Sequence, residues 1–343
     1  MESSDTSRQV AAGIKSSIPP SYFLVPPYSV KYDNPTTDLV INRSTQSTRP
    51  PVFRIVAGDP VMVAISNAMA DNTSQANQAN QAVFGGRVRV PFISATCKHR
   101  PAGSHPSDPP SYEQRLCQGS NLRQTLTSLR PGGFYPISAT AGIFSNKVVV
   151  NLGPWDNSES PESPHHLPVV SVTPLRRPAV KGRGTIYSHE REKNTIRGTI
   201  CGALRICLYH RYNRVVIGDF GLGSVYRNPP QALAEIWRDL LLFDPVLRGQ
   251  FAYVIFAFED PTQSTTQGHW DTLLQCRERE RGRRLAAEGT FSNFTSPMAA
   301  EGLHSESRAP TDMAVFQSVF HPDEIERVLQ KPDPRCSMAM VLS

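Results

Sequence analysis

Short, almost purely apolar runs occur along the chain, separated by segments of mixed polarity. Runs of this kind, rich in β-branched and aromatic residues, are typical of buried β-strands. We expect strands at 53–57, 88–94, 147–152, 167–173, 215–217 and 251–258. The last of them, Phe-Ala-Tyr-Val-Ile-Phe-Ala-Phe, is the most apolar and is expected at the centre of a sheet.

Between these runs, apolar residues recur at the spacing of one helix face. Asp59-Pro60 is a good N-cap and first-turn pair for one helix, and a second is expected from Ser111 to about Leu129. Further helices are predicted after Ser188, after Pro229 and near 313–320. Because strands alternate with helices and the inner strands are apolar throughout, the chain is expected to be an α/β protein folded as an α/β/α sandwich.

A glycine loop follows the apolar run 215–217. Gly218, Gly221 and Gly223 precede the helix that opens at Pro229, so the order is strand, glycine loop and helix. Glycines let the backbone approach a ligand closely, and successive loop N–H groups favour anions such as phosphate. A tight connection without a ligand explains the same residues. Tyr226 stands where a dinucleotide fingerprint needs its third glycine, and the Gly-Lys-Ser/Thr of a P-loop is absent from the sequence.

Composition limits the domain organisation. Thirty prolines and 19% charged residues among 343 indicate much loop or tail. We expect a disordered Ser/Thr/Pro-rich tail over 1–50, one domain over 51–330 with a polar insertion at about 261–310, and a C-terminal tail over 331–343.

The net charge and the targeting signals limit the classes of binding partner and the cellular location that we expect. A net charge of +6 mildly favours acidic partners but is too low to indicate specific nucleic-acid binding. Signal-peptide and transmembrane patterns are missing, so a cytoplasmic or nuclear protein without membrane partners is expected. The six cysteines lack C-x-x-C spacing and His165-His166 lacks further ligands, which predicts reduced thiols, no metal and no cofactor.

Three groups of motifs together resemble the microbial-type poly(ADP-ribose) glycohydrolases, a branch of the macrodomain superfamily. The first is Leu116-Cys-x-x-Ser-Asn-Leu122 with Phe134-Tyr-Pro-Ile137, Gly142-Ile-Phe-Ser145 and Val148-Val-Val150; the second is Val169-Val-Ser-Val172 with Arg176-Arg-Pro-Ala179; the third is the glycine loop with the 251–258 run. The resemblance extends from about Phe53 to Leu329. It implies a three-layer macrodomain-like sandwich with a mixed central sheet.

The resemblance also implies a pocket for ADP-ribose, free or attached to a protein. By this analogy, Gly221, Leu222, Gly223 and Ser224 surround the diphosphate, Tyr226 packs on a ring or a ribose, and Val225 and Gly103 belong to the same pocket. The oligomeric state is not indicated by the sequence.

The catalytic signature departs from that of the family. Members carry Pro-Gly-Gly-Gly and then Gln-Glu-Glu, whose second Glu assists departure of the ribose-linked group. Here the loop is Pro101-Ala-Gly-Ser104, the triplet falls on Tyr112-Glu113-Gln114, and Cys97 or a neighbour stands where a ribose-contacting Asn is expected. An amide at Gln114 cannot donate a proton or activate water at neutral pH.

Three hypotheses follow. The first is a macrodomain that binds ADP-ribose and hydrolyses it weakly or not at all. The second is an active glycohydrolase that uses Glu113, after a local rearrangement of the helix, or another acid such as Asp108. The third is a scaffold that has kept the fold and lost the ligand. The retained glycine loop argues against the third, and Gln114 argues against the second.

Overall fold

The computed structural model of the chain describes residues 29–42, 47–73, 89–103, 111–127, 133–150, 165–287 and 308–330. By their contacts these residues fall into two units. Unit 1 comprises the chain up to residue 174 together with 195–220 and 240–259, and unit 2 comprises 175–194, 221–239 and 260 onward. Within the described residues, no helix has both the length and the apolar character needed to cross a bilayer.

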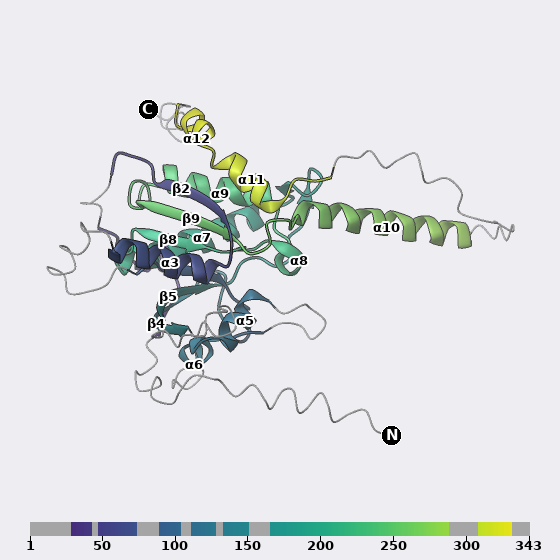
Figure 1. Cartoon of the computed structure of the whole chain (residues 1–343). Coiled ribbons are helices and arrows are strands. Elements are labelled where there is room, and N and C mark those ends of the chain that lie inside the picture. The colour runs from purple at the N-terminus through teal and green to yellow at the C-terminus, as the bar shows by residue number, and fades with distance from the viewer. Residues whose placement is uncertain are drawn as a thin grey trace, which may run out of the picture. The chain divides into compact units, whose positions relative to one another are not determined.

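Unit 1 contains a seven-stranded sheet with the order β1-β4-β5-β3-β8-β9-β2. The strands are β1 (Ser29–Tyr32), β2 (Val52–Ala57), β3 (Phe92–Ala95), β4 (Gly142–Val150), β5 (His165–Val172), β8 (Arg214–Ile217) and β9 (Tyr253–Phe258). Figure 1 labels five of them, from β2 through β9, β8 and β5 to β4, in the same order. β9 lies inside the sheet between β8 and β2, as its apolar sequence predicts.

The sheet is mixed, as expected. β4 is antiparallel to both β1 and β5, whereas the other neighbouring strands pair in parallel. The carboxyl ends of β2, β3, β5, β8 and β9 therefore point to one edge. In parallel α/β sheets this edge is where ligands bind.

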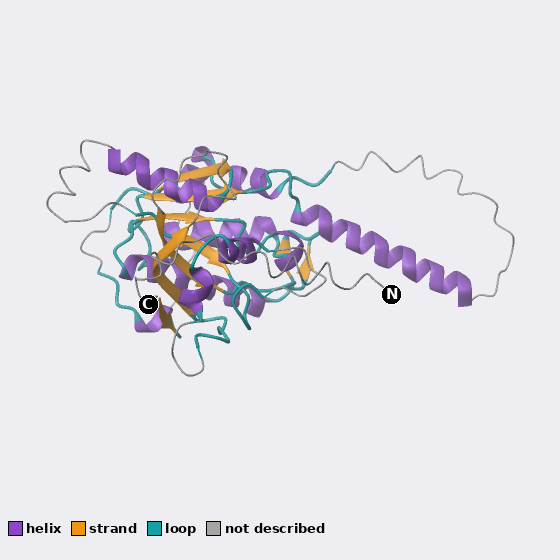
Figure 2. Ribbon diagram, turned by 60° about the horizontal axis from the view of Figure 1, so that its bottom comes forward, coloured by secondary structure: helices purple, strands orange, loops and turns teal. Residues whose placement is uncertain are grey.

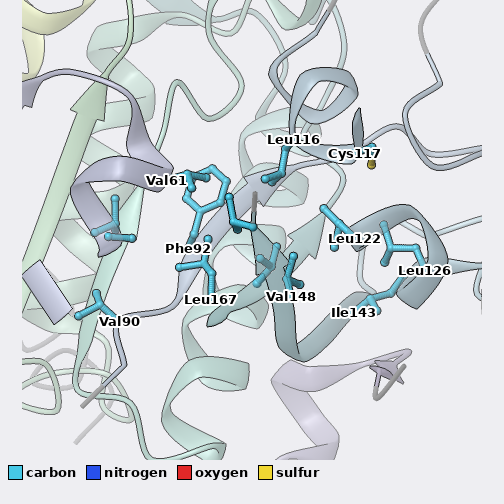
Figure 3. Close-up of a cluster of buried hydrophobic side chains, with 14 of the residues drawn as sticks. Val61, Val90, Phe92, Leu116, Cys117, Leu122, Leu126, Ile143, Val148 and Leu167 are labelled. Atoms are coloured by element: carbon cyan, nitrogen blue, oxygen red, sulfur yellow. The ribbon is translucent and has the colours of Figure 1, made fainter. Parts of the chain in front are cut away.

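The apolar residues on one face of the sheet pack against three helices of unit 1, α3 (Pro60–Thr73), α5 (Tyr112–Gln118) and α6 (Leu122–Leu126). Phe92, Val148 and Leu167 point from the strands into a cluster with Val61 of α3 and Leu116 of α5 (Figure 3). All of these side chains are at most 2% exposed. Their burial contributes to the hydrophobic stabilisation on this face.

The other face of the sheet contacts α7 (Glu190–Tyr209). The backbone of Gly142 lies so close to Ile206 that an added Cβ would stand 2.6 Å from its Cδ1 atom. The ring of His210 stacks on Phe144 with 3.6 Å between centroids. Helices thus flank the orange strands on both sides (Figure 2), and the predicted three-layer α/β/α fold is confirmed.

The predicted helix from Ser111 to Leu129 is two helices, α5 and α6. The chain leaves the helical path at Gly119, and Ser120 forms an isolated bridge with Val150 of β4. Asn121 then accepts a hydrogen bond from Val149 N–H at 2.8 Å through its side-chain oxygen. Pairing with β4 therefore overrides the helical pattern. Residues 128–129 lie outside the described part.

Part of the predicted N-terminal tail is ordered, which corrects the expectation for those residues. β1 pairs with β4, and the short helix α2 (Pro35–Asp38) follows it. The prediction failed because Ser29–Tyr32 is only four residues long and is stabilised by pairing with a distant strand.

Unit 2 contains the two-stranded sheet of β6 (Val180–Lys181) and β7 (Ile186–Tyr187), the helices α8 (Gly223–Tyr226), α11 (Asp312–Val319) and α12 (Pro322–Leu329), and the first part of α9 (Pro230–Phe243). It also holds α10 (Thr265–Ala287), the long green helix in Figure 1. α10 occupies much of the predicted polar insertion. Residues 271–284 are exposed throughout, which explains why the sequence shows no helical periodicity there.

Candidate functional site

The carboxyl ends of β2, β3 and β9 in unit 1 bring four polar or ionisable residues to one edge of the sheet. Asp59 follows β2, Thr96 and Cys97 follow β3, and Glu259 directly follows β9. The edge is held together by the backbone, since Gly58 N–H donates to Phe258 O at 2.8 Å. Helix α5 contacts residues of all three strand ends through Tyr112, Glu113 and Arg115.

Glu113 is the buried acid of this group, with 2% of its surface exposed. Its carboxylate accepts hydrogen bonds from the Thr96 hydroxyl, from Cys97 N–H at 2.8 Å and from Ala102 N–H at 3.2 Å. Thr96 Oγ1 also lies 3.2 Å from the hydroxyl of Tyr135. The acid therefore joins the end of β3 to the segment Pro101–Gly103.

Burial raises the pKa of Glu113 to about 7, although its hydrogen bonds from Thr96, Cys97 and Ala102 oppose this rise. Charging a carboxyl is costly in a low-dielectric interior, and donors to the charged form recover only part of that cost. Glu113 can therefore hold or release a proton near neutral pH. Perturbed carboxyls of this kind are enriched at functional sites.

Two ionisable groups near Glu113, Cys117 and Tyr135, are neutral at neutral pH. Burial, reinforced by the Glu113 charge, raises the pKa of the Cys117 thiol to about 12. The same two causes raise the pKa of Tyr135 well above its usual range. Both groups can act as hydrogen-bonding partners but not as nucleophilic anions at neutral pH.

Tyr112 joins α5 to the start of α3. Its hydroxyl donates to the Asp59 carboxylate and accepts from Val61 N–H at 3.2 Å. Asp59 caps α3 as the sequence predicts, accepting from the N–H groups of Val61 at 2.9 Å and Met62 at 3.0 Å. Burial and the Asp59 charge raise the pKa of Tyr112 far above its usual range.

Arg115 joins α5 to the end of β9. Its guanidinium forms a two-pronged ion pair with the Glu259 carboxylate and lies over the Tyr112 ring, 5.3 Å from its centroid. This pair is part-exposed. Together with Tyr112–Asp59 it fixes the orientation of the helix that carries Glu113.

Gln114, which the sequence resemblance aligns with the family's acid position, lies in the first turn of α5 and is partly buried. Its backbone N–H donates to Ser111 Oγ at 3.3 Å. Consecutive residues on a helix point about 100° apart, so the Gln114 side chain leaves the helix in a direction different from that of Glu113.

Gly103 lies against Cys97. A Cβ at Gly103 would stand 3.0 Å from the Cys97 sulfur and 3.0 Å from Arg100 O, so a side chain does not fit there. Its neighbour Ala102 has a left-handed backbone with φ of 54°. Glycine adopts this conformation without strain and alanine does not. Ser104 and Asp108 lie outside the described residues.

Of the glycine loop, Gly218 belongs to unit 1, whereas Gly221 and Gly223 belong to unit 2. Gly221 and Gly223 have φ of 76° and 72°, which explains why glycines occur there. Gly223 N–H donates to Thr265 Oγ1 at 2.8 Å, and Thr265 Oγ1 donates to the Asp312 carboxylate at 2.7 Å. The N–H of Gly223 is thus already hydrogen-bonded within unit 2. The role of this glycine is therefore to allow the left-handed backbone conformation.

Asn228 holds the other side of the loop. Its amide donates to Gly221 O at 2.7 Å and to Leu175 O at 2.8 Å, and it accepts from the Tyr187 hydroxyl at 3.0 Å. Of the other predicted loop residues, Leu222 is buried, Ser224 is exposed, and Val225 and Tyr226 are partly exposed. Backbone geometry rather than side-chain chemistry distinguishes this loop.

The structure brings Cys97, Gly103 and Glu113 together in unit 1, and Gly221 to Tyr226 together in unit 2. Sequence reasoning missed Thr96, Tyr135, Arg115 and the Tyr112–Asp59 contact. Thr96 follows an apolar run directly and could have been found by that position. The described residues contain no group of three or more His, Cys, Asp or Glu side chains able to hold a metal ion.

Comparison with solved structures finds similarity to microbial poly(ADP-ribose) glycohydrolases. The enzyme from Thermomonospora curvata matches with a TM-score of 0.51 at 20% identity, over 69% of this chain and 82% of that one. The same enzyme bound to the inhibitor ADP-HPD gives 0.47 at 22% identity over 69% and 82%. The enzyme from Deinococcus radiodurans in complex with ADP-ribose gives 0.46 at 18% identity over 68% and 88%.

The similarity to the Thermomonospora curvata enzyme shows a shared fold. The resemblance inferred from the sequence motifs is confirmed at that level. Comparison with protein-family models gave no match. Comparison with curated proteins by sequence also gave no match.

Proposed function

We propose that the chain recognises ADP-ribose, free or attached to a protein, and that it hydrolyses the ribosidic bond weakly or not at all. The observation that carries the proposal is the buried Glu113 carboxyl, held by three donors at the carboxyl edge of a sheet whose fold is that of a poly(ADP-ribose) glycohydrolase. A buried acid with a raised pKa at this edge is typical of a ligand site rather than of a structural core.

The proposed weakness of hydrolysis rests on the chemistry of Gln114. Cleaving a ribosidic bond through an oxocarbenium-like transition state needs a carboxyl that gives a proton and then activates water. The amide of Gln114 does neither at neutral pH. Loss of such a group costs about 10²- to 10⁴-fold in rate.

The alternative is an active glycohydrolase in which Glu113 supplies the proton. Its pKa of about 7 favours this role, since a general acid works best when its pKa is near the working pH. Its 2% exposure and its bonds to Cys97 and Ala102 oppose it, because the acid would have to leave these donors to meet a substrate. We therefore place this function second.

The glycine loop is proposed to contribute to diphosphate binding, as the sequence resemblance implies. Gly221 and Gly223 would hold the left-handed backbone that the loop requires. Leu222, Ser224, Val225 and Tyr226 complete the proposed contact segment. Because the Gly223 N–H already donates to Thr265, backbone donors for the ligand would come from other residues of the segment.

Calorimetric titration of the whole chain with ADP-ribose tests binding. Micromolar affinity is expected, with a loss of at least tenfold in Gly223→Ala. Gly198→Ala is the matched control, since an added Cβ at Gly198 would meet no atom within 4 Å beyond its chain neighbours and the backbone of its own helix. Absence of both heat and thermal stabilisation at millimolar ADP-ribose would contradict the proposal.

Hydrolysis is tested by measuring the turnover of poly(ADP-ribose) and of an ADP-ribosylated substrate protein. Wild type is compared with the variants Gln114→Glu, Glu113→Gln and Gln118→Glu. Wild type is expected to show little release of ADP-ribose, and Gln114→Glu is expected to gain activity. If Glu113 is the acid, Glu113→Gln removes the activity of wild type and Gln114→Glu changes it little. Gln118→Glu, at an exposed position of the same helix, controls for the added charge.

A further inference from the structure

We propose that unit 2 carries a second anion site, which takes a phosphate or diphosphate group and lies between the β6–β7 hairpin and the first turns of α10. The site is a cavity of about 240 Å³. Its charged and polar lining residues are Arg177, Lys181, Arg183, Arg227, His269 and Thr272. This site is independent of the proposed ADP-ribose function and goes beyond it.

The charge of the cavity selects the ligand class. Four of its lining residues are arginine or lysine, and no aspartate or glutamate is among the lining residues that the structure describes. Cations that converge on one cavity attract anions, and guanidinium groups favour phosphate oxygens in particular.

Arg227 is held in place before any ligand arrives. Its guanidinium donates to Gly268 O at 2.5 Å and to Thr272 Oγ1 at 2.8 Å, both on α10. Its backbone has φ of 58°, and its carbonyl lies 3.0 Å from His269 Nε2. A fixed cation loses less conformational entropy on binding than a free one, which increases affinity.

The hairpin that carries Lys181 and Arg183 is attached to α10 as well. Trp270 Nε1 donates to Arg183 O at 2.6 Å, and the Arg183 guanidinium lies over the Trp270 ring, 6.0 Å from its centroid. Gly184 lies so close to His269 that an added Cβ would be 2.9 Å from the histidine Cβ. The two walls of the cavity are thus built as one unit.

The volume of the cavity limits what it can enclose. It is smaller than the roughly 300 Å³ at which pockets for drug-sized ligands begin. It therefore suits a phosphate or diphosphate group, with any attached nucleoside lying outside. Inorganic diphosphate and a nucleoside diphosphate are the two sources of this chemistry.

The test is a titration of the full chain with inorganic pyrophosphate, followed through the indole N–H signal of Trp270 by NMR. The chain has three tryptophans, so Trp270→Phe assigns this signal. A saturable shift is expected. Its midpoint should move at least tenfold higher in Lys181→Glu/Arg183→Glu, because both changed residues are cavity cations with exposed positions.

The matched control is Arg279→Glu/Arg283→Glu, which makes the same change in net charge at exposed positions of α10 outside the cavity. Its midpoint is expected to stay within twofold of wild type. No Trp270 response at millimolar pyrophosphate in wild type, or equal weakening in both double variants, would overturn the proposal. A parallel titration with ADP identifies the source: tighter binding than pyrophosphate indicates a nucleoside diphosphate, and equal binding indicates the phosphate groups alone.

Discussion

The Glu113 carboxylate accepts a hydrogen bond from the N–H of Ala102 at 3.2 Å, and Ala102 holds the left-handed conformation at φ of 54°. An alanine in this region costs about 1 kcal/mol or more relative to an extended or helical residue. The contact with the buried acid therefore coincides with local backbone strain, as is common at functional sites.

Ala102→Gly is expected to stabilise the chain by about 0.5–1 kcal/mol, because glycine adopts this φ without strain. Denaturant unfolding measures the effect. Ala139→Gly is the matched control: Ala139 is exposed and has no left-handed backbone, so the same change there should destabilise by about 0.5–1 kcal/mol. Equal destabilisation by both changes would contradict the strain at Ala102.

Glu113 is expected to make stability depend on pH. Its pKa rises from an ordinary value of 4.5 to about 7 on folding, so the folded chain binds the proton more tightly than the unfolded chain does. The resulting stabilisation is fully present below pH 4.5 and is lost as pH rises through about 7. The loss is on the order of 3 kcal/mol.

Urea unfolding of wild type and Glu113→Gln at several pH values between 4.5 and 8 measures this dependence. The amide does not titrate, and the other groups contribute alike to both proteins, so the difference between the two curves isolates Glu113. We expect wild type to lose stability relative to the variant as pH rises. Parallel curves would show that the pKa of Glu113 is not raised.

Gly223→Ala is expected to destabilise unit 2 by about 1–2 kcal/mol for two reasons. The backbone at Gly223 has φ of 72°, and an added Cβ would stand 2.8 Å from Gln263 Oε1. The double variant Gly223→Ala/Gln263→Ala removes only the second cause. In thermal unfolding, Gly223→Ala should therefore destabilise the Gln263→Ala protein less than it destabilises wild type, but the effect should not vanish. No destabilisation in the Gln263→Ala background would contradict the backbone contribution.

The α/β/α fold could be predicted because β5, β8 and β9 contain apolar runs that are buried in the sheet and can be recognised from local composition. Asp59 could be predicted as a helix cap because its hydrogen-bond partners lie only two and three residues away in the sequence. Glu113 was named as a candidate from its place in a motif. These features depend on residues close in sequence or on a recognisable pattern.

The rest depends on contacts between distant residues. Thr96 and Glu113 are 17 positions apart, and Arg115 and Glu259 are 144 apart, so neither pairing leaves a local signal. β1 was missed because its partner β4 is more than a hundred residues away. α10 was missed because its exposed face removes the apolar periodicity on which helix prediction depends.

Arg115 and Glu259 are expected to show a coupling free energy of about 1 kcal/mol in a double-mutant cycle of Arg115→Ala and Glu259→Ala. The ion pair is two-pronged, which favours it, but both side chains are about a third exposed, and solvent screening reduces its energy. Urea unfolding at 50 mM and 500 mM salt measures the cycle, and the coupling should fall at the higher concentration. Arg115→Lys keeps the charge but cannot bind both carboxylate oxygens in the same plane, so it should retain less than half of the coupling. A coupling near zero at low salt would mean that the pair does not help to hold α5, and hence Glu113, at the sheet edge.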